Sequence, residues 1–307
     1  MIITINKAVY KAFGYYLESD IALPELQEVG DHNAEVDISV QIKDLTETWS
    51  ELSTPPRKLV VQENLVMFEI SETAIFSVVG GRDIFVSPAI GADVDKIRLY
   101  LLGTCMGAIL LQRKVLPMHG SAVVVDNKAY AFIGDSGNGK STLASAFLQR
   151  GFRLLSDDVI AVSLGEGNIP YVTPAYPQQK LWQESLDFFG MQADQFRPVF
   201  DRETKFAIPV RSQFSTEALP LAGVFELVKT DSAEVELKPI QKLERLHLLY
   251  RHTYRNYLLA NSGLTEWHFH TTTSIVNKID CFQLRRPVTE FTAHQLSSLI
   301  LSAIGKE

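Results

Sequence analysis

Short apolar runs separated by turn residues dominate the first ninety or so residues of the chain. Most of them alternate apolar and polar positions or are rich in β-branched residues, which is typical of strands. The runs lie at 12–17, 36–40, 58–61, 65–70, 74–79 and 84–87, and residues 1–7 also alternate like a first strand. The pattern predicts a β-rich N-terminal region over 1–92, in which we recognise no catalytic motif.

A helical period replaces this alternation from about residue 93. The apolar positions that recur at helical spacing are Val94, Ile97, Leu101, Cys105, Ala108 and Leu111. They predict a helix over 93–113 that opens a second domain, 93–307. Its most apolar part, 99–111, is shorter than the 20 or so residues that span a bilayer, so the pattern favours a buried helix.

Two β-rich runs, 116–125 and 128–133, follow this helix and are separated only by Asp126 and Asn127. A two-residue Asp-Asn connection predicts a hairpin with antiparallel strands. Further strands are expected at 152–155, 159–163, 205–210, 222–228 and 279–284, and helices at 141–150, 243–259 and 291–304. Strands mixed with helices predict an α/β domain.

The strand at 128–133 leads into a complete G-x-x-x-x-G-K-[ST] motif, and the helix at 141–150 follows it. In this motif backbone N–H groups and the helix N-terminus hold phosphates, Lys140 reaches the β- and γ-oxygens, and Ser141 ligates Mg²⁺. The expected nucleotide-binding residues are Gly134, Asp135, Ser136, Gly137, Asn138, Gly139, Lys140, Ser141 and Thr142. A glycine-rich turn with an incidental lysine is the alternative.

Asp157 and Asp158 lie about one helix downstream of Lys140, between two apolar runs. Ligands of open α/β sheets bind beyond the carboxyl ends of the strands, so an acid that ends the strand next to the phosphate-loop strand should face the γ-phosphate or its metal. One acid can accept the proton of an acceptor hydroxyl, and the other can order metal-bound water or a cation. The alternatives are a helix cap or exposed turn for the acids, and a structural role for His119 in the hairpin.

Composition narrows the class of protein. The chain has 307 residues, 46% hydrophobic and 21% charged, which is typical of a globular protein. A net charge of −7 argues against a nucleic-acid partner. Cys105 and Cys281 have no metal-ligand spacing, so we expect reduced, buried thiols. The N-terminus has no secretion signal and no membrane span is expected, so the sequence predicts a cytoplasmic protein.

Three segments in register, 119–126, 131–144 and 149–159, resemble the catalytic core of the bacterial HPr kinase/phosphorylase family. That family carries an HG pair, a GxSGxGKS loop and an RGHRLxxDD segment at this spacing. The resemblance covers roughly 118–162 without gaps. It implies a P-loop domain related to phosphoenolpyruvate carboxykinase, here preceded by the smaller β-rich domain.

The resemblance also implies ATP- and Mg²⁺-dependent phosphorylation of a seryl hydroxyl in a peptide or protein, and a homo-oligomer. By position, Asp157 is the base toward the acceptor serine, Asp158 its supporting acid and a metal-site residue with Ser141, and His119 lies near the γ-phosphate. Lys140 and Lys205 are the expected catalytic cations. Lys180 and the pair Arg251 and Arg255 are further candidates to bind anions.

The chain departs from the family after the two aspartates. A glycine-containing segment of ERRGxGI type is replaced by residues 173–182. The resemblance therefore leaves HPr specificity and a reverse phosphorylase activity open. The β-rich N-terminal region and 23–26 look more like stand-alone HPr-kinase-like proteins of peptide-tailoring clusters, some of which resemble kinases of the C-terminal serine of lasso-peptide precursors. A P-loop ATPase or small-molecule kinase, and a non-catalytic nucleotide-binding adaptor, stay open as alternatives.

Overall fold

The computed structural model describes residues 7–30, 35–54, 56, 58–199 and 202–306. They form two compact units, which we describe separately. Unit 1 contains the residues up to Val115 with Val199–Glu203 and Arg255–His268, and unit 2 contains Leu116–Pro198, Thr204–Tyr254 and the residues from Phe269 onward. The predicted strand at 1–7 lies outside the described residues except for Lys7.

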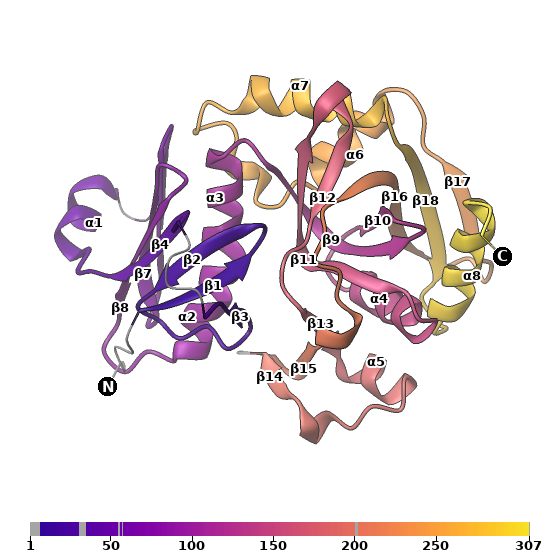
Figure 1. Cartoon of the computed structure of the whole chain (residues 1–307), viewed down its shortest axis with the longest axis horizontal. Helices are drawn as coiled ribbons and strands as arrows, with labels where there is room; N and C mark the ends of the chain where they lie inside the picture. Colours follow the sequence, from indigo (N-terminus) through magenta and orange to yellow (C-terminus); the bar gives the residue numbers. More distant parts are fainter. Residues whose placement is uncertain (1–6, 31–34, 55, 57, 200–201, 307) are drawn as a thin grey trace. The chain divides into compact units, whose positions relative to one another are not determined.

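Unit 1, whose N-terminal strands are coloured indigo to purple in Figure 1, is built on an eight-stranded sheet in the order β3-β1-β2-β4-β8-β7-β6-β5. Its elements are β1 (Ala8–Ala12), β2 (Tyr15–Ser19), β3 (Gln27–Glu28), β4 (Ile38–Ile42), α1 (Thr46–Leu52), β5 (Leu59–Gln62), β6 (Leu65–Ile70), β7 (Ala74–Val79), β8 (Asp83–Pro88), α2 (Val94–Tyr100), α3 (Met106–Gln112) and the 3-10 turn η5 (Asn256–Leu258). The β-rich prediction for this region is confirmed, because the predicted runs from 36 to 87 overlap β4 to β8.

One predicted strand, 12–17, is wrong. Phe13 and Gly14 have φ of 53° and 79°, so the chain turns there and β1 pairs with β2 in a hairpin, Ala12 opposite Tyr15. A two-residue turn with positive φ at both positions matches the twist of the two strands. Because Phe13 is apolar and buried, the sequence reads as one apolar run and does not reveal the turn.

The predicted helix at 93–113 is present as α2, a π-helical stretch η1 (Leu101–Cys105) and α3. Ile97, Leu101, Cys105 and Ala108 are at most 1% exposed, which confirms the predicted core-facing stripe. The compact units group this helix with the N-terminal strands. The domain boundary predicted at 92–93 stays a prediction.

Unit 2 contains a seven-stranded sheet in the order β10-β9-β11-β12-β16-β18-β17, and β10 also pairs with β16. That extra pairing closes β10, β9, β11, β12 and β16 into a ring. A separate three-stranded sheet has the order β13-β15-β14. The strands are β9 (Leu116–Val125), β10 (Lys128–Ile133), β11 (Arg153–Leu164), β12 (Pro170–Thr173), β13 (Gln178–Trp182), β14 (Arg197–Val199), β15 (Arg202–Pro209), β16 (Leu219–Thr230), β17 (Glu236–Pro239) and β18 (Asp280–Pro287).

The helices of unit 2 confirm the predicted α/β character. They are α4 (Lys140–Gln149), α5 (Gln183–Phe188), α6 (Leu243–Arg251), α7 (Thr265–Val276, which begins in unit 1) and α8 (Ala293–Ala303), with the 3-10 turns η2 (Glu166–Asn168), η3 (Ala193–Gln195) and η4 (Arg211–Gln213). The expected helices at 141–150 and 291–304 correspond to α4 and α8. The expected helix at 243–259 ends earlier, at Arg251.

The predicted hairpin at 126–127 is confirmed. Strands β9 and β10 pair antiparallel with Lys128 opposite Val125, and Ile133 at the far end lies opposite Gly120. Asp126 and Asn127 have φ of 48° and 55°, the values that a two-residue primed turn requires. His119 therefore lies next to the end of β10 at which the phosphate loop begins.

The prediction for Asp157 and Asp158 needs two corrections. They do not end a strand, because β11 runs continuously through both of them. Nor is β11 next to the phosphate-loop strand, because β9 lies between β10 and β11. Strand β11 is irregular around the two aspartates, because its register shifts between Leu154 and Ser156 and Asp158 has a φ of 76°. The interruption of the apolar pattern at these polar residues coincides with this irregularity.

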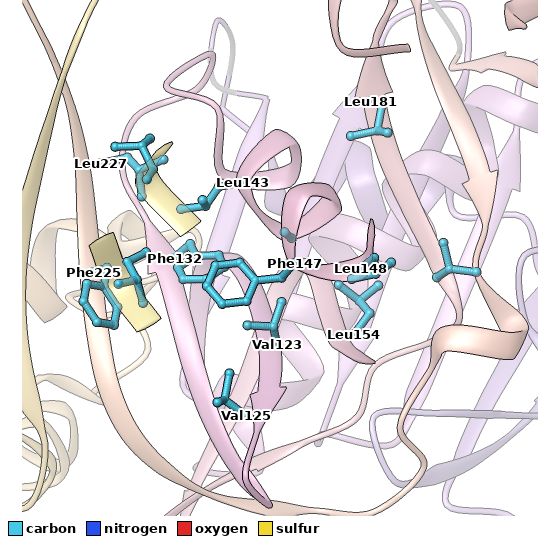
Figure 2. Packing of buried hydrophobic residues seen from close by; sticks show 14 of the residues in the cluster. Val123, Val125, Phe132, Leu143, Phe147, Leu148, Leu154, Leu181, Phe225 and Leu227 are labelled. Atoms are coloured by element: carbon cyan, nitrogen blue, oxygen red, sulfur yellow. The ribbon is translucent and has the colours of Figure 1, made fainter. Parts of the chain in front are cut away.

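A hydrophobic cluster fixes α4 against the sheet. Phe132 of β10 and Phe147 of α4 have ring centroids 5.2 Å apart, and Phe225 of β16 stacks on Phe282 of β18 at the same distance. Figure 2 shows Phe132 and Phe147 at the centre of this packing, with Leu143 nearby. Helix α8 packs alongside α4 (Figure 1). The first turn of α4, and with it the phosphate loop, is thereby held at the end of β10.

Both cysteines are buried and free, as expected. Within the described part of the chain, no helix combines the length and apolar character needed to cross a membrane.

Candidate active site

The predicted phosphate loop connects β10 to α4, and its conformation depends on glycine. Gly134, Gly137 and Gly139 have φ of 142°, 84° and 97°. A Cβ atom on Gly134 would lie 2.6 Å from the carbonyl oxygen of Leu227 on β16, closer than two such atoms can approach. Because glycine alone tolerates these angles, the loop can turn its backbone N–H groups toward a common ligand.

Lys140 folds back over the loop that precedes it. Its ammonium donates to the carbonyl oxygens of Gly134, at 2.9 Å, and Asp135, at 3.0 Å, and the residue is 7% exposed. Burial lowers the pKa of Lys140, while the charges of Asp157 and then Asp158 oppose this shift. The loop lysine thus lies within electrostatic reach of both aspartates.

Three later elements hold the loop from outside, one through a backbone carbonyl and two through arginine side chains. Asn138 donates to the carbonyl oxygen of Leu227 at 2.8 Å, and the Nε of Arg286 on β18 donates to the carbonyl oxygen of Asn138 at 3.0 Å. Arg251, at the end of α6, pairs with the exposed carboxylate of Asp135 at 2.7 Å. The sequence indicated Arg251 as an anion-binding residue, whereas Arg286 was missed although Arg285-Arg286-Pro287 directly follows a predicted strand. Arg255 lies in unit 1, where it donates to Thr104.

Asp157 is 4% exposed and is held at both carboxylate oxygens. The hydroxyl of Ser121, its partner on β9, donates to Oδ1, and the backbone N–H of Lys180 donates to Oδ2 at 2.8 Å. These are neutral donors, and each carboxylate oxygen keeps a further lone pair. Asp157 is therefore a positioned carboxylate with remaining capacity to accept a proton or a hydrogen bond.

Asp158 has a different partner, a lysine from the neighbouring sheet. The ammonium of Lys180 on β13 lies 2.6 Å from Oδ2, and Nδ1 of His119 lies 3.6 Å from Oδ1. Burial by itself would raise the pKa of Asp158, but the charge and the hydrogen bond of Lys180 outweigh it, so the pKa is lowered. For Lys180 burial opposes the charged form, yet the carboxylate of Asp158 raises the pKa. The pair is ionised, and Asp158 serves as an anion rather than as a base.

His119 faces the backbone of Asp158 as well as its side chain. Nδ1 lies 3.0 Å from the carbonyl oxygen of Asp158, and because that oxygen only accepts, Nδ1 carries the hydrogen. Burial lowers the pKa of His119, against the charge of Asp158. A neutral ring with Nδ1 protonated leaves Nε2 as an acceptor. The backbone N–H of His119 donates to the carbonyl oxygen of His252, which ties β9 to the end of α6.

Lys205 lies on β15 opposite Trp182 of β13, and its ammonium lies 5.4 Å from the centre of the Trp182 ring. Its charge contributes to lowering the pKa of Asp158 and of Lys140. The structure thus places Lys205 close enough to add positive potential at Asp158. The role assigned to it stays a prediction.

Ser141 and Thr142 begin α4 in different surroundings. The backbone oxygen of Ser141 accepts from Gln179 at 3.4 Å, whereas the hydroxyl of Thr142 is 2.9 Å from that of Ser185 on α5. Ser136 lies exposed in the loop. As predictions, Ser141 remains the hydroxyl ligand of a metal and Thr142 a loop-binding residue.

Besides Asp157, the structure contains another buried acid, which the sequence analysis missed. It lies on a strand that pairs with the loop strand β10. Glu226 on β16 lies opposite Ile133 of β10 and is 7% exposed. It is 3.1 Å from Nε2 of His252 and accepts from Gln283 at 3.0 Å. The hydrogen bond from His252 is the largest of the effects that lower the pKa of Glu226. An acid within the apolar run 222–228 was the only signal of it.

Comparisons with known proteins give sequence matches over part of the chain. No protein-family model matches the chain. An HPr kinase/phosphorylase of Mycoplasmopsis pulmonis is 39% identical over 84 residues, which are 25% of this chain and 27% of the relative. An HPr kinase/phosphorylase of Clostridium novyi is 31% identical over 170 residues, 50% of this chain and 54% of the relative. The matches thus span about half or less of these curated relatives.

A solved structure, the Hpr(Ser) kinase/phosphatase from Coxiella burnetii, aligns with 62% of this chain and 88% of its own at 14% identity and a TM-score of 0.34. Over the matched segments the chain is similar to HPr kinase/phosphorylases, and the resemblance seen in the sequence is supported to that extent.

The ion pair between Lys180 and Asp158 carries a testable consequence for stability. Replacing Lys180 with methionine removes the ammonium partner of a partly buried carboxylate, and we expect the free energy of unfolding at pH 7 to fall by about 2–4 kcal/mol. Because the folded-state pKa of Asp158 is lowered in the wild type, the pair stabilises fully above the ordinary aspartate pKa of about 4, and its contribution is lost as the pH falls from there toward the folded-state pKa. The difference between variant and wild type should therefore be smaller at about pH 2 than at pH 7.

Urea unfolding at both pH values measures this effect. Lys238→Met is the matched control, because that lysine pairs with Glu236 at an exposed site and its removal should leave stability unchanged. An equal loss of stability at pH 7 and at about pH 2 would show that the pair has no electrostatic role.

Proposed function

We propose that unit 2 is an ATP- and Mg²⁺-dependent kinase that phosphorylates a seryl hydroxyl of a peptide or protein. The observation that carries the proposal is the meeting of the glycine-rich loop with a carboxylate that neutral donors hold. Ser121 of β9 lies opposite Phe132, near the end of β10 where the loop begins, and opposite Asp157 of β11. Within the described part of the chain, Asp157 accepts from the Ser121 hydroxyl and the Lys180 N–H. The similarity to HPr kinase/phosphorylases supports the same reading.

In this reaction the acceptor oxygen attacks the γ-phosphorus as the bond to the β-phosphate oxygen breaks. The proton of the hydroxyl passes to Asp157, and ADP leaves. Lys140 moves from the carbonyl oxygens of Gly134 and Asp135 to the phosphates, which offer it charge-assisted hydrogen bonds. Such catalysis is mostly positioning and charge stabilisation.

The residues fit Mg²⁺ in the way that this ion binds alongside nucleotides. Mg²⁺ takes one or two protein oxygens, with phosphates and water completing its shell. Oδ2 of Asp158 is occupied by Lys180, whereas Oδ1 lies 3.6 Å from the His119 ring and can accept a ligand. Ser141 at the start of α4 supplies the hydroxyl. When bound, the ion neutralises charge that develops on the β- and γ-phosphates.

The acceptor is proposed to be serine, with the C-terminal serine of a lasso-peptide precursor as the specific candidate and the cytoplasm as the setting. An ATPase or a small-molecule kinase would use the same loop. A non-catalytic adaptor is disfavoured because Lys140, Asp157 and Asp158 are all present.

A homo-oligomer is also part of the proposal.

The experiment is transfer of the γ-phosphate from radiolabelled ATP with Mg²⁺ in four reactions. They contain a peptide that ends in serine, the same peptide ending in alanine, HPr protein, or no acceptor. The kinase proposal expects label on the serine-ended peptide and none on its alanine counterpart. Label on HPr would instead make HPr the acceptor, and ADP release at equal rates in every reaction would contradict the kinase in favour of an ATPase.

A further inference from the structure

A pocket of about 280 Å³ lies on the outer side of the phosphate loop, within unit 2. Gly137 and Gly139 of the loop and Thr142 of α4 form one side, and the opposite side comes from the segment between β18 and α8. The aspartates, His119 and Lys180 are not among the described residues that line it. The pocket therefore adjoins the loop away from the acids.

The lining combines apolar side chains with two cations and with two carboxylates, Glu184 and Glu290. Trp182, Val288 and Phe291 are among the apolar members, and Val288 and Phe291 are 51% and 38% exposed. Lys229 and Arg286 are the cations, and they are paired positions on the adjacent strands β16 and β18. Arg286 also holds the loop through Asn138. An apolar wall beside positive charge suits a ligand with a flat ring at one end and a phosphate at the other.

A buried hydroxyl in the pocket lacks a partner. Thr292 is 5% exposed, and within the described part of the chain its Oγ1 has no hydrogen-bond partner. Thr292 is the N-cap of α8, yet its side chain makes no capping hydrogen bond. A cap threonine ordinarily accepts from the first turn of its helix, and a buried polar group without a partner is costly. The hydroxyl is available to a ligand that enters this pocket.

The orientation of the triphosphate along the loop decides which end of a bound nucleotide lies next to the pocket. In a phosphate loop the lysine reaches the β- and γ-phosphates, and the backbone holds the α- and β-phosphates. The Lys140 ammonium lies at the start of the loop, where it donates to Gly134 and Asp135, and Gly120 connects that end of β10 to Asp158 across the sheet. The γ-phosphate end therefore lies on the side of the acids. The nucleoside must leave at the other end of the triphosphate, where Gly137 and Gly139 border the pocket.

We propose that this pocket binds the adenosine of ATP. The base packs against Trp182 and Phe291 and hydrogen-bonds to the Thr292 hydroxyl, and Lys229 and Arg286 neutralise the α-phosphate. The volume is at the small end for ligand sites, which suits a nucleoside and is too small for an acceptor peptide. The inference rests on the proposed function for the presence of ATP, but it concerns binding and needs no phosphoryl transfer.

The test compares the affinities of Mg·ATP and Mg·tripolyphosphate by calorimetry in the full chain. Thr292→Val removes the hydroxyl at nearly constant shape and should weaken ATP about 3- to 10-fold, the cost of one hydrogen bond. Phe291→Ala should weaken ATP about tenfold or more by removing packing area. Neither should change tripolyphosphate binding, because this ligand has no nucleoside.

Phe269→Ala is the matched control, since this phenylalanine is 57% exposed and does not line the pocket. Phe291 also stacks on Phe188 at 3.7 Å, so the Phe291→Ala variant is checked by thermal unfolding. If that variant unfolds, Thr292→Val carries the test.

Unchanged ATP affinity in Thr292→Val, or equal losses for ATP and tripolyphosphate, overturns the proposal that the pocket binds the adenosine. ATP binding that depends on Thr292 in a protein that phosphorylates no acceptor contradicts the kinase and supports the pocket.

Discussion

Asp157→Asn is expected to reduce phosphoryl transfer to a serine acceptor by about 10²- to 10⁴-fold, the usual contribution of a general base. The affinity for Mg·ATP should stay within about threefold of the wild type, because Asp157 receives the acceptor proton and does not hold the phosphates in our proposal. The change preserves shape. The amide oxygen can accept from the Lys180 N–H, and the amide nitrogen can donate to the Ser121 hydroxyl, which accepts once it rotates.

Initial rates with the labelled peptide and calorimetry with ATP measure the two quantities separately. Asp231→Asn, at an exposed turn, is the control and should behave as the wild type. Transfer within about tenfold of the wild type would remove Asp157 from the role of base. Parallel loss of ATP affinity would assign it to phosphate or metal binding instead.

Lys140→Ala is expected to weaken both Mg·ATP and Mg·tripolyphosphate by about 100-fold. A hydrogen bond to a charged group contributes about 1.5–3 kcal/mol, and the ammonium makes this contribution to phosphates common to the two ligands. The equal effect on both ligands separates Lys140 from the pocket residues, which act on ATP alone. The fold should persist, since within the described residues the Lys140 ammonium donates to carbonyl oxygens of its own loop, which water can satisfy.

Calorimetry with the two ligands checks this expectation. Lys128→Ala is the matched control, because it removes an exposed lysine at the opposite end of the same strand. If Lys140→Ala binds ATP as tightly as the wild type, the segment 134–141 is not a phosphate loop, and both the kinase and the nucleoside pocket lose their basis.

Much of the local structure could be predicted because its causes are local. The glycine spacing in 134–139, the apolar run before it and the helix-forming run after it define strand, loop and helix without reference to the rest of the chain. Asp126 and Asn127 define the hairpin in the same way. Where the sequence misled, at Phe13 and at Asp157-Asp158, an unusual φ was accommodated inside an apolar run.

The partners of the site residues could not be predicted, because they come from segments distant in the chain. Lys180 is 22 residues from Asp158, and Arg286 is 148 residues from Asn138. The difference between the two aspartates arises in this way. Ser121 and a backbone N–H leave Asp157 with neutral donors, whereas Lys180 pairs Asp158 as an ion.

The sequence by itself determined that this chain carries a glycine-rich G-x-x-x-x-G-K-S loop between a strand and a helix, with two acids downstream, because glycine conformation and hydrophobic period act over a few residues. The tertiary structure decided which strand lies beside which, which acid pairs with a lysine, and where a pocket adjoins the loop. Those outcomes depend on β9 being placed between β10 and β11 and on β13 and α8 packing beside them. Such pairings depend on how the apolar faces of sheets and helices are buried against one another. This burial is a property of the assembled fold, so no single segment of the sequence determines it.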